Sequence, residues 1–216
     1  MRRLTRIVRA LLAILGAWMA VQLCWRLLRR LFPFPVPPLM SPLLDSPLRE
    51  LSQPRKETVE RLGLRPGQRV LEIGIGSGYF TLEAARLLGP DGRLTAVDVQ
   101  PQIVAQAASK VAREGLANVE VRVASSSTLP FSDGTFDLVF LVTVLGAVPD
   151  KGRTLREIRR VLKPNGRLSI TESMADPDYL LMAEVVGWAQ TVGFELVEQY
   201  GNAFLYTLNF RSIFGP

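Results

Sequence analysis

Residues 69–80 read RVLEIGIGSGYF, and this stretch decides the fold. Its first part, residues 69–73, is an apolar run typical of a strand, and from Gly74 onward it becomes a glycine-rich turn of the form GxGxG. Glycines let the backbone approach a ligand closely where a strand turns tightly into a helix. The spacing departs from the GxGxxG fingerprint of dinucleotide-binding proteins, because Tyr79 and Thr81 stand where a third glycine would be. By itself, the turn predicts a ligand site without naming the ligand.

Strand-like and helical segments alternate on either side of this turn. We expect helices over residues 56–62, 79–88, 102–114, 154–162 and 179–192, and strands over residues 69–73, 94–97, 119–123, 136–142, 167–171, 195–200 and 203–210. This alternation predicts an α/β fold in which a mostly parallel sheet carries helices on both faces. In such sheets, ligands bind at the carboxyl ends of the strands, near the point where the strand order reverses.

A carboxylate stands at the end of the second expected strand. Asp98 closes the run LTAVD and lies 20 residues beyond Gly78. A carboxylate at this point can accept hydrogen bonds from both hydroxyls of a ribose, and each such bond is worth about 1.5–3 kcal/mol. The alternative is that Asp98 only caps the turn after its strand.

The composition excludes several classes of chemistry. The 216 residues contain no histidine and a single cysteine, Cys24. A His general base, a Ser-His-Asp or Cys-His nucleophile system and a His-ligated metal site are therefore excluded. One cysteine also excludes disulfide frameworks and thiolate clusters, so no metal site is expected.

The net charge of +6 is concentrated at the N-terminus. Seven of the 26 basic residues, all arginines, lie within residues 1–30, which contain no acidic residue. The other 19 are balanced by the 20 acidic residues of the chain, so residues 31–216 carry no surplus of positive charge. Because nucleic-acid enzymes need a basic surface to neutralise phosphates, we expect no nucleic-acid partner.

Residues 1–30 have the pattern of a membrane anchor. The 16 residues between Arg9 and Arg26 are uncharged, and a helix of that length covers about 24 Å, less than the ~30 Å of a hydrocarbon core. A cleaved signal peptide, a single transmembrane span, a monotopic helix and a buried core helix are the four readings. The arginines on both flanks favour a monotopic helix on the anionic cytoplasmic face, which would hold the rest of the chain at that membrane surface.

Residues 31–54 are expected to form a linker. Seven of the 15 prolines lie between Phe32 and Pro54, and proline at this density disfavours helix and favours an extended chain. The residues between the prolines are largely apolar, so the segment is either a spacer packed on the domain or an apolar collar between membrane and active site. Residues 55–216 then form the globular domain.

Further motifs follow the turn in order. They are Val97-Asp98, Leu129-Pro130-Phe131 with Phe136-Asp137-Leu138-Val139, and REIRRVLKPNGRL over residues 156–168. Together with residues 70–78, they resemble the class I S-adenosylmethionine-dependent methyltransferases, and among these the small-molecule branch that includes ubiquinone/menaquinone-biosynthesis C-methyltransferases. The resemblance spans about residues 51–211. It implies a Rossmann-like, doubly wound sheet of seven strands, mostly parallel, with one antiparallel strand inserted by the last hairpin.

By position, the resemblance also implies which residues hold S-adenosylmethionine and its product S-adenosylhomocysteine. Glu72, Gly74, Gly76, Gly78 and Tyr79 would surround the methionine end, Asp98 would hold the ribose with Val99 against the adenine, Ala124 and Ser125 would meet the adenine edge, and Val142 and Thr143 would line the methyl-transfer side. One residue departs from the pattern: where Ser125 stands, many relatives have an aspartate that accepts from the adenine amino group.

Methyl transfer from a sulfonium needs little acid–base chemistry. It is an in-line displacement with an activated leaving group, so positioning and desolvation can supply most of the catalysis without a histidine. Glu172, at the end of the fifth expected strand, is the candidate base if the acceptor must lose a proton, followed by Asp176, Asp178 and Tyr179. Each of them could equally be a cap or a solvated loop residue.

The acceptor is expected to be small and lipophilic, such as a quinone precursor, a phospholipid headgroup or an isoprenoid. The fourth strand ends LVTVLG over residues 141–146, without the Asn/Asp-Pro-Pro-aromatic tetrad expected for methylation of amide or base nitrogens. Cys24 lies in the expected anchor, which disfavours cytosine C5 and arsenic chemistry. The alternatives are a membrane-tethered binding protein without catalysis, a methyltransferase for a water-soluble metabolite, and a nicotinamide oxidoreductase.

Overall fold

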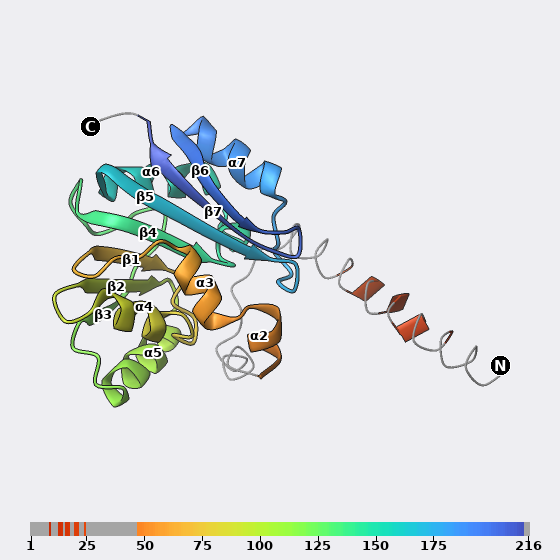
Figure 1. The fold of residues 1–216 in the computed structure, drawn as a ribbon, viewed down its shortest axis with the longest axis horizontal. Helices are drawn as coiled ribbons and strands as arrows, with labels where there is room; N and C mark the ends of the chain where they lie inside the picture. The colour runs from red at the N-terminus through yellow and green to blue at the C-terminus, as the bar shows by residue number, and fades with distance from the viewer. Residues whose placement is uncertain are drawn as a thin grey trace. The chain divides into compact units, whose positions relative to one another are not determined.

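The computed structural model describes residues 47–213, together with eight residues near the N-terminus: Arg9, Ala13, Ile14, Gly16, Ala17, Ala20, Val21 and Cys24. Those eight residues are helical and exposed. Residues 47–213 form one seven-stranded sheet with helices on both faces (Figure 1). Its strands are β1 (Arg69–Ile73), β2 (Arg93–Asp98), β3 (Val119–Val123), β4 (Phe136–Val142), β5 (Leu162–Ser173), β6 (Phe194–Gly201) and β7 (Leu205–Ser212).

The strand order is β3-β2-β1-β4-β5-β7-β6. Neighbours from β3 to β5 pair in parallel, whereas β7 is antiparallel to both β5 and β6. The expected Rossmann-like sheet with one antiparallel strand is therefore confirmed. The order reverses between β1 and β4, so the carboxyl ends of β1, β2 and β4 meet at the edge where such folds bind ligands.

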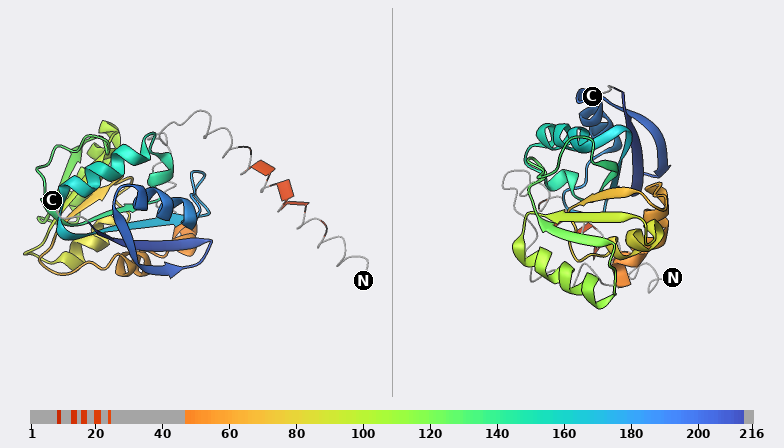
Figure 2. Two further views of the ribbon diagram at one scale, coloured as in Figure 1. Left: turned by 90° about the horizontal axis from the view of Figure 1, so that it is seen from above. Right: turned by 90° about the vertical axis from the view of Figure 1, so that its left-hand side faces the viewer.

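Two groups of helices cover the two faces of the sheet (Figures 1 and 2). On one face, α3 (Arg55–Arg61), α4 (Thr81–Leu88) and α5 (Pro101–Arg113) lie over the strands; the other face carries α6 (Lys151–Val161) and α7 (Met182–Thr191). Because side chains alternate along a strand, neighbouring residues of β4 serve different cores: Phe140 packs in the cluster around Val59 of α3, and Val139 packs in the cluster around Leu155 of α6. β4 is buried on both faces, as its continuous apolar sequence predicts.

Two helices begin three residues away from the expected residue. The helix expected over residues 154–162 begins at Lys151, because the carboxylate of Asp150 accepts from the backbone nitrogen of Arg153 at 2.8 Å and caps it. The helix expected from residue 179 begins only at Met182. Tyr179 and Leu180 are instead held against the last hairpin, where the Tyr179 hydroxyl donates to the Ala203 carbonyl at 2.6 Å.

Strand β5 also extends further than expected. It begins at Leu162, directly after α6, and continues through Lys163-Pro164-Asn165-Gly166, which lie between the helix and the strand expected from the sequence. Asn165 has a positive φ of 65°, a conformation that asparagine tolerates better than most residues. The strand therefore pairs with β4 first at Phe136 and, after an irregularity, again from Leu138.

Part of the proline-rich stretch is helical. Residues Pro47–Ser52 form α2, so the expectation of an extended chain is wrong for this part. Proline at the first position of a helix sacrifices no hydrogen bond, because the first backbone N–H groups have no partner within the helix. Gln53, just after α2, is buried, which shows that this segment packs on the domain.

Among the residues that the structure describes, no helix combines the length and the apolar character needed to cross a membrane. Apart from the eight N-terminal residues named above, the expected anchor at residues 1–30 lies outside the described residues. The same holds for residues 31–46 of the expected linker.

Candidate cofactor site

The glycine-rich turn links β1 to α4 at the carboxyl edge of the sheet. Gly74, Gly76 and Gly78 all have positive φ, at 81°, 52° and 72°, a conformation that favours glycine. The backbone nitrogen of Gly74 donates to the carbonyl of Val97 at 2.8 Å, which ties the turn to β2. A β-carbon on Gly78 would make ordinary van der Waals contact, 3.8 Å from Oγ1 of Thr81 and 3.9 Å from Cδ of Lys110, so the positive φ and not crowding favours glycine there.

Asp98, at the end of β2, lies directly against this turn. Its Oδ2 accepts from the backbone nitrogen of Gly76 at 3.4 Å, and its Oδ1 accepts from that of Gln100 at 3.0 Å. Burial raises the pKa of Asp98 above its ordinary value, and these backbone N–H groups oppose that rise. The next residue, Val99, is 58% exposed. The structure thus brings the two motifs that are expected to hold the cofactor into contact.

Glu72 lies at the base of the turn and is fully buried. The Thr81 hydroxyl donates to its Oε2 at 2.6 Å. Burial raises the pKa of Glu72 to about 8, against the lowering effects of this hydrogen bond and of the positive charge of Arg49. At neutral pH the carboxyl is therefore mostly protonated, and a cationic ligand placed next to it would favour its ionised form.

Tyr79 binds a segment that sequence reasoning did not assign to the site. Its hydroxyl donates to Glu50 of α2, and the guanidinium carbons of Arg49 and Arg55 lie 4.6 Å and 4.1 Å from the centroid of its ring. Arg49 also lies 5.1 Å from the centroid of the Phe80 ring. No motif in the sequence indicated this contact, because α2 lies within the expected linker.

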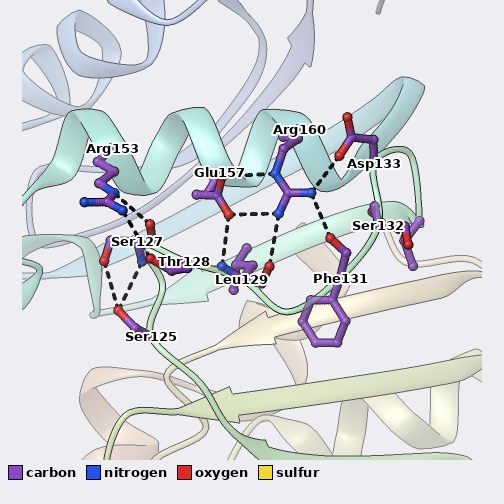
Figure 3. Close-up of polar contacts among 11 residues, drawn as sticks. Ser125, Ser127, Thr128, Leu129, Phe131, Ser132, Asp133, Arg153, Glu157 and Arg160 are labelled. Atoms are coloured by element: carbon purple, nitrogen blue, oxygen red, sulfur yellow. Dashed lines mark hydrogen bonds and ion pairs between the residues drawn. The ribbon is translucent and has the colours of Figure 1, made fainter.

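The loop after β3 carries the residues expected at the adenine edge. The backbone nitrogen of Ala124 donates to the Asp98 carbonyl at 3.0 Å, which holds this loop beside β2. Ser125 is exposed, and its hydroxyl lies 2.9 Å from that of Ser127 (Figure 3). Ser125 therefore offers a hydroxyl group that interacts with Ser127, where an aspartate would offer a carboxylate.

Two charged residues of α6 hold the continuation of this loop (Figure 3). Glu157 accepts from the backbone nitrogen of Leu129 at 2.9 Å, and Arg160 donates to the carbonyls of Leu129 at 3.0 Å and Phe131 at 2.8 Å. Arg160 also pairs with Glu157 and Asp133, and its hydrogen bond to Glu157 is the main reason that the pKa of that carboxyl is lowered. The REIRRVL motif therefore serves to position the loop that follows the adenine-edge residues.

The residues expected on the methyl-transfer side follow the end of β4. Val142 is 7% exposed and packs in the core with Phe140 and Tyr79. Thr143 has a positive φ of 53°, unusual for a β-branched residue, and its backbone nitrogen donates to the Thr171 carbonyl at 2.8 Å. A short 3-10 turn, η2 (Leu145–Ala147), comes next. Strained backbone of this kind is typical of ligand sites.

Glu172, the candidate base, lies near the end of β5 and is 1% exposed. Burial, followed by the negative charges of Asp176 and Asp178, raises its pKa well above the ordinary value, while the backbone N–H of Gly146 opposes this rise. Its Oε1 is buried and has no hydrogen-bond partner. Its surroundings therefore favour the neutral form of Glu172, which lies beside the η2 turn.

These residues fit a nucleoside ligand with a cationic amino-acid end. Asp98 faces the glycine-rich turn, Val99 is exposed, and Glu72 is a buried carboxyl at the base of the turn. The described residues contain no group of three or more His, Cys, Asp and Glu side chains that could hold a metal ion.

Comparison with known proteins agrees with this geometry. Curated relatives include the ubiquinone/menaquinone biosynthesis C-methyltransferase UbiE of Teredinibacter turnerae, 38% identical over 128 residues, which are 59% of this chain and 51% of that protein. An arsenite methyltransferase of Halobacterium salinarum is 35% identical over 109 residues, 50% of this chain and 28% of that protein. The chain spans about half the length of the UbiE proteins that it matches.

The fold is also shared with solved structures. A SAM-dependent methyltransferase from Aquifex aeolicus superposes with a TM-score of 0.77 at 24% identity, covering 83% of this chain and all of that one. Residues 64–200 match the family described as "Methyltransferase domain". With the glycine-rich turn on Asp98, these matches show that the chain belongs to the class I S-adenosylmethionine-dependent methyltransferases, with S-adenosylmethionine as the methyl donor.

Proposed function

We propose that this chain transfers a methyl group from S-adenosylmethionine to a small lipophilic acceptor at a membrane surface. The methyl-transfer part of this proposal rests on the contact between Asp98 and the glycine-rich turn. Asp98 accepts from the backbone nitrogen of Gly76, and Glu72 is buried beneath the same turn. Similarity to UbiE proteins, which are named as quinone-biosynthesis C-methyltransferases, supports a small-molecule acceptor.

The protein's own part in the reaction is positioning. When bound, S-adenosylmethionine supplies an activated methyl group, because its sulfonium leaves as a neutral thioether. Asp98 orients the ribose, Glu72 offers a carboxyl beneath the cationic end, and the segment from Thr143 through η2 lies beside the turn, where Val144 packs on Gly74. Holding donor and acceptor in line supplies much of the rate enhancement in such displacements.

The lipophilic character of the acceptor is inferred from the N-terminal sequence. Residues 10–25 are uncharged and, apart from Gln22, largely apolar between arginine flanks, and the residues between the prolines that follow are also largely apolar. We propose a monotopic anchor that holds the domain on the cytoplasmic face, where it raises the local concentration of a membrane-resident acceptor such as a quinone precursor. Arsenite is a less suitable acceptor, because thiol chemistry for arsenic would rest on Cys24 alone.

Transfer of a labelled methyl group tests this proposal. Full-length protein in detergent is incubated with methyl-labelled S-adenosylmethionine and a total membrane lipid extract, and the label is then partitioned. We expect label in the organic phase, loss of that label in Asp98→Ala, and retention in Asp91→Ala, which changes an exposed aspartate outside the site. Label confined to the aqueous phase would indicate a water-soluble acceptor. Cofactor binding without any transfer would favour a binding protein.

Removal of residues 2–30 tests the membrane part separately. We expect turnover of an acceptor embedded in vesicles to fall, while the affinity for S-adenosylhomocysteine stays the same. Unchanged turnover on vesicles would contradict the anchor.

A further inference from the structure

A cavity of about 310 Å³ lies at the edge of the sheet opposite to the cofactor site. It is lined by residues of the turn before β1, by Asp137 near the start of β4, and by residues 163–167 in the first part of β5. Because β1, β4 and β5 are parallel, their starts meet at one edge, whereas the glycine-rich turn lies at the other. The five residues of β1 separate the two edges by about 16 Å, so this cavity is a distinct place on the molecule.

The irregular start of β5 forms one wall of the cavity. In its register with β4, Leu162 lies opposite Phe136 and Arg167 lies opposite Leu138, so residues 163–166 stand opposite Asp137 alone. All four of these residues line the cavity. The extra length of the strand therefore surrounds a space instead of adding to the ladder of the sheet.

Two of the three basic residues in the lining already have acidic partners. The Lys163 ammonium lies 2.6 Å from Oδ1 of Asp137, the acidic residue of the lining. Arg167 pairs with Glu198 of β6, which lies outside the lining, and its Nε is buried without a hydrogen-bond partner.

Arg65 is the basic residue of the lining that these pairs leave over. Its side chain is exposed and makes no hydrogen bond or ion pair within the part of the chain that the structure describes. Its backbone nitrogen donates to Oε1 of Gln68 at 2.8 Å, which fixes the turn that carries it. The charge of Arg69 also acts on Asp137. Four basic residues thus stand beside two acidic ones, which leaves a surplus of two positive charges at the cavity.

A surplus of two charges suits a phosphate monoester, which carries about −1.5 to −2 at pH 7, better than a carboxylate with a single charge. A guanidinium binds phosphate through two parallel hydrogen bonds, and Arg65 has these donors available. The volume lies at the lower end of the range of about 300–1,000 Å³ for small-molecule sites, so a small ligand is expected.

We propose that this cavity binds the phosphate monoester of a small molecule. Arg65 donates to the phosphate oxygens, and Lys163 and Arg167 add positive charge from the strand that forms the opposite wall. The site is separate from methyl transfer and does not depend on which acceptor the protein uses.

The experiment compares two soluble phosphates. Glycerol 3-phosphate is a monoester, and glycerophosphoglycerol is a diester with the chemistry of a phospholipid headgroup. Titration calorimetry at constant ionic strength measures both affinities for the full chain and for its variants Arg65→Gln, Arg65→Lys and Arg113→Gln. Arg113 is an exposed arginine of α5 that does not line the cavity. Circular dichroism and the affinity for S-adenosylhomocysteine verify that each variant is folded.

We expect glycerol 3-phosphate to bind with a Kd of about 1 mM or below. Arg65→Gln should lower this affinity by about 10- to 100-fold, the range for loss of a charge-assisted pair, and Arg65→Lys should restore part of it, because it keeps the charge without the fork. Arg113→Gln should stay within about twofold, and the affinity for S-adenosylhomocysteine should be the same in all variants.

Four results would overturn the assignment. Absence of saturable binding, or an equal loss in Arg65→Gln and Arg113→Gln, would show that the cavity holds no phosphate. Displacement of glycerol 3-phosphate by S-adenosylhomocysteine would place the phosphate in the cofactor site. Binding of the diester as tightly as the monoester would exclude recognition of a monoester and point to a lipid headgroup.

Discussion

A β-carbon on Gly74 would lie 2.4 Å from Cγ2 of Val144, so the turn after β1 and the segment after β4 are packed to the limit at this point. The two segments flank the position where the strand order reverses, and their contact brings the donor side of the site next to the expected acceptor side. Position 74 therefore requires glycine for two reasons. Its φ of 81° lies in the left-handed region, and a β-carbon there would clash with Val144.

Gly74→Ala should therefore destabilise the protein by about 2–5 kcal/mol, which combines left-handed strain of about 1–2 kcal/mol with an overpacking cost of about 1–3 kcal/mol. Gly67→Ala is the matched control, because Gly67 has a φ of 80° with nothing within 4 Å of the added carbon. Urea unfolding should show a loss of only about 1–2 kcal/mol for the control. Equal losses in the two variants would show that contact with Val144 costs nothing, and Gly74→Ala combined with Val144→Ala should recover the steric part.

Glu72 should make the stability of the ligand-free protein depend on pH. Its pKa is about 8 in the folded state and near 4.5 when unfolded, so the neutral acid is favoured in the fold. The stability it contributes is complete below pH 4.5 and is lost as the pH rises through about 8. Burial of Glu172 changes stability with pH in the same direction. The test is therefore the difference in the free energy of unfolding between the wild-type protein and Glu72→Gln, measured by chemical unfolding from pH 5 to 9. That difference should change with pH, and a constant difference would contradict a buried neutral Glu72.

Arg160→Ala should loosen the loop after β3. The change leaves the carbonyls of Leu129 and Phe131 without their donor and removes the partner of Glu157, at a cost of about 1–3 kcal/mol. Thermal unfolding measures this loss, and hydrogen exchange at the Leu129 amide should become faster. Arg86→Ala breaks the exposed pair with Glu114 and should cost less than about 1 kcal/mol. If the two variants lose the same stability, Arg160 has no special role in holding the loop.

Glu172→Gln distinguishes a base from a structural acid. The amide has the size of the neutral carboxyl that the fold favours, so thermal stability and S-adenosylhomocysteine affinity should remain close to those of the unchanged protein. If Glu172 takes the acceptor's proton, turnover should fall by about 100-fold or more. Asp150→Asn is the control, because it changes a carboxylate that only caps α6 and should leave turnover the same. Full turnover in Glu172→Gln would leave this residue a structural role alone.

The sequence located most elements, and it did so best where local pattern and burial agree. The bounds of β1, β3 and β4 are those expected, because each is a short apolar or β-branched run between turn residues. It was less accurate where a tertiary contact sets a boundary. Helix α7 begins only at Met182, because two hydrogen bonds hold the preceding residues. The Tyr179 hydroxyl donates to the Ala203 carbonyl, 24 residues away, and the Tyr206 hydroxyl donates to the Leu180 carbonyl, 26 residues away.

By itself, the sequence determined the α/β class and the two motifs of the cofactor site, since a glycine-rich turn and a carboxylate at the next strand end carry their chemistry in local spacing. Only the tertiary structure placed Glu50 and Arg49 against Tyr79, because they lie 29 and 30 positions from it in the chain and the contact depends on how α2 packs. It also decided that burial raises the carboxyl pKa of Glu72 and of Glu172. A carboxyl pKa is governed by how much water and which charges surround the group, and those surroundings come from several strands and helices at once.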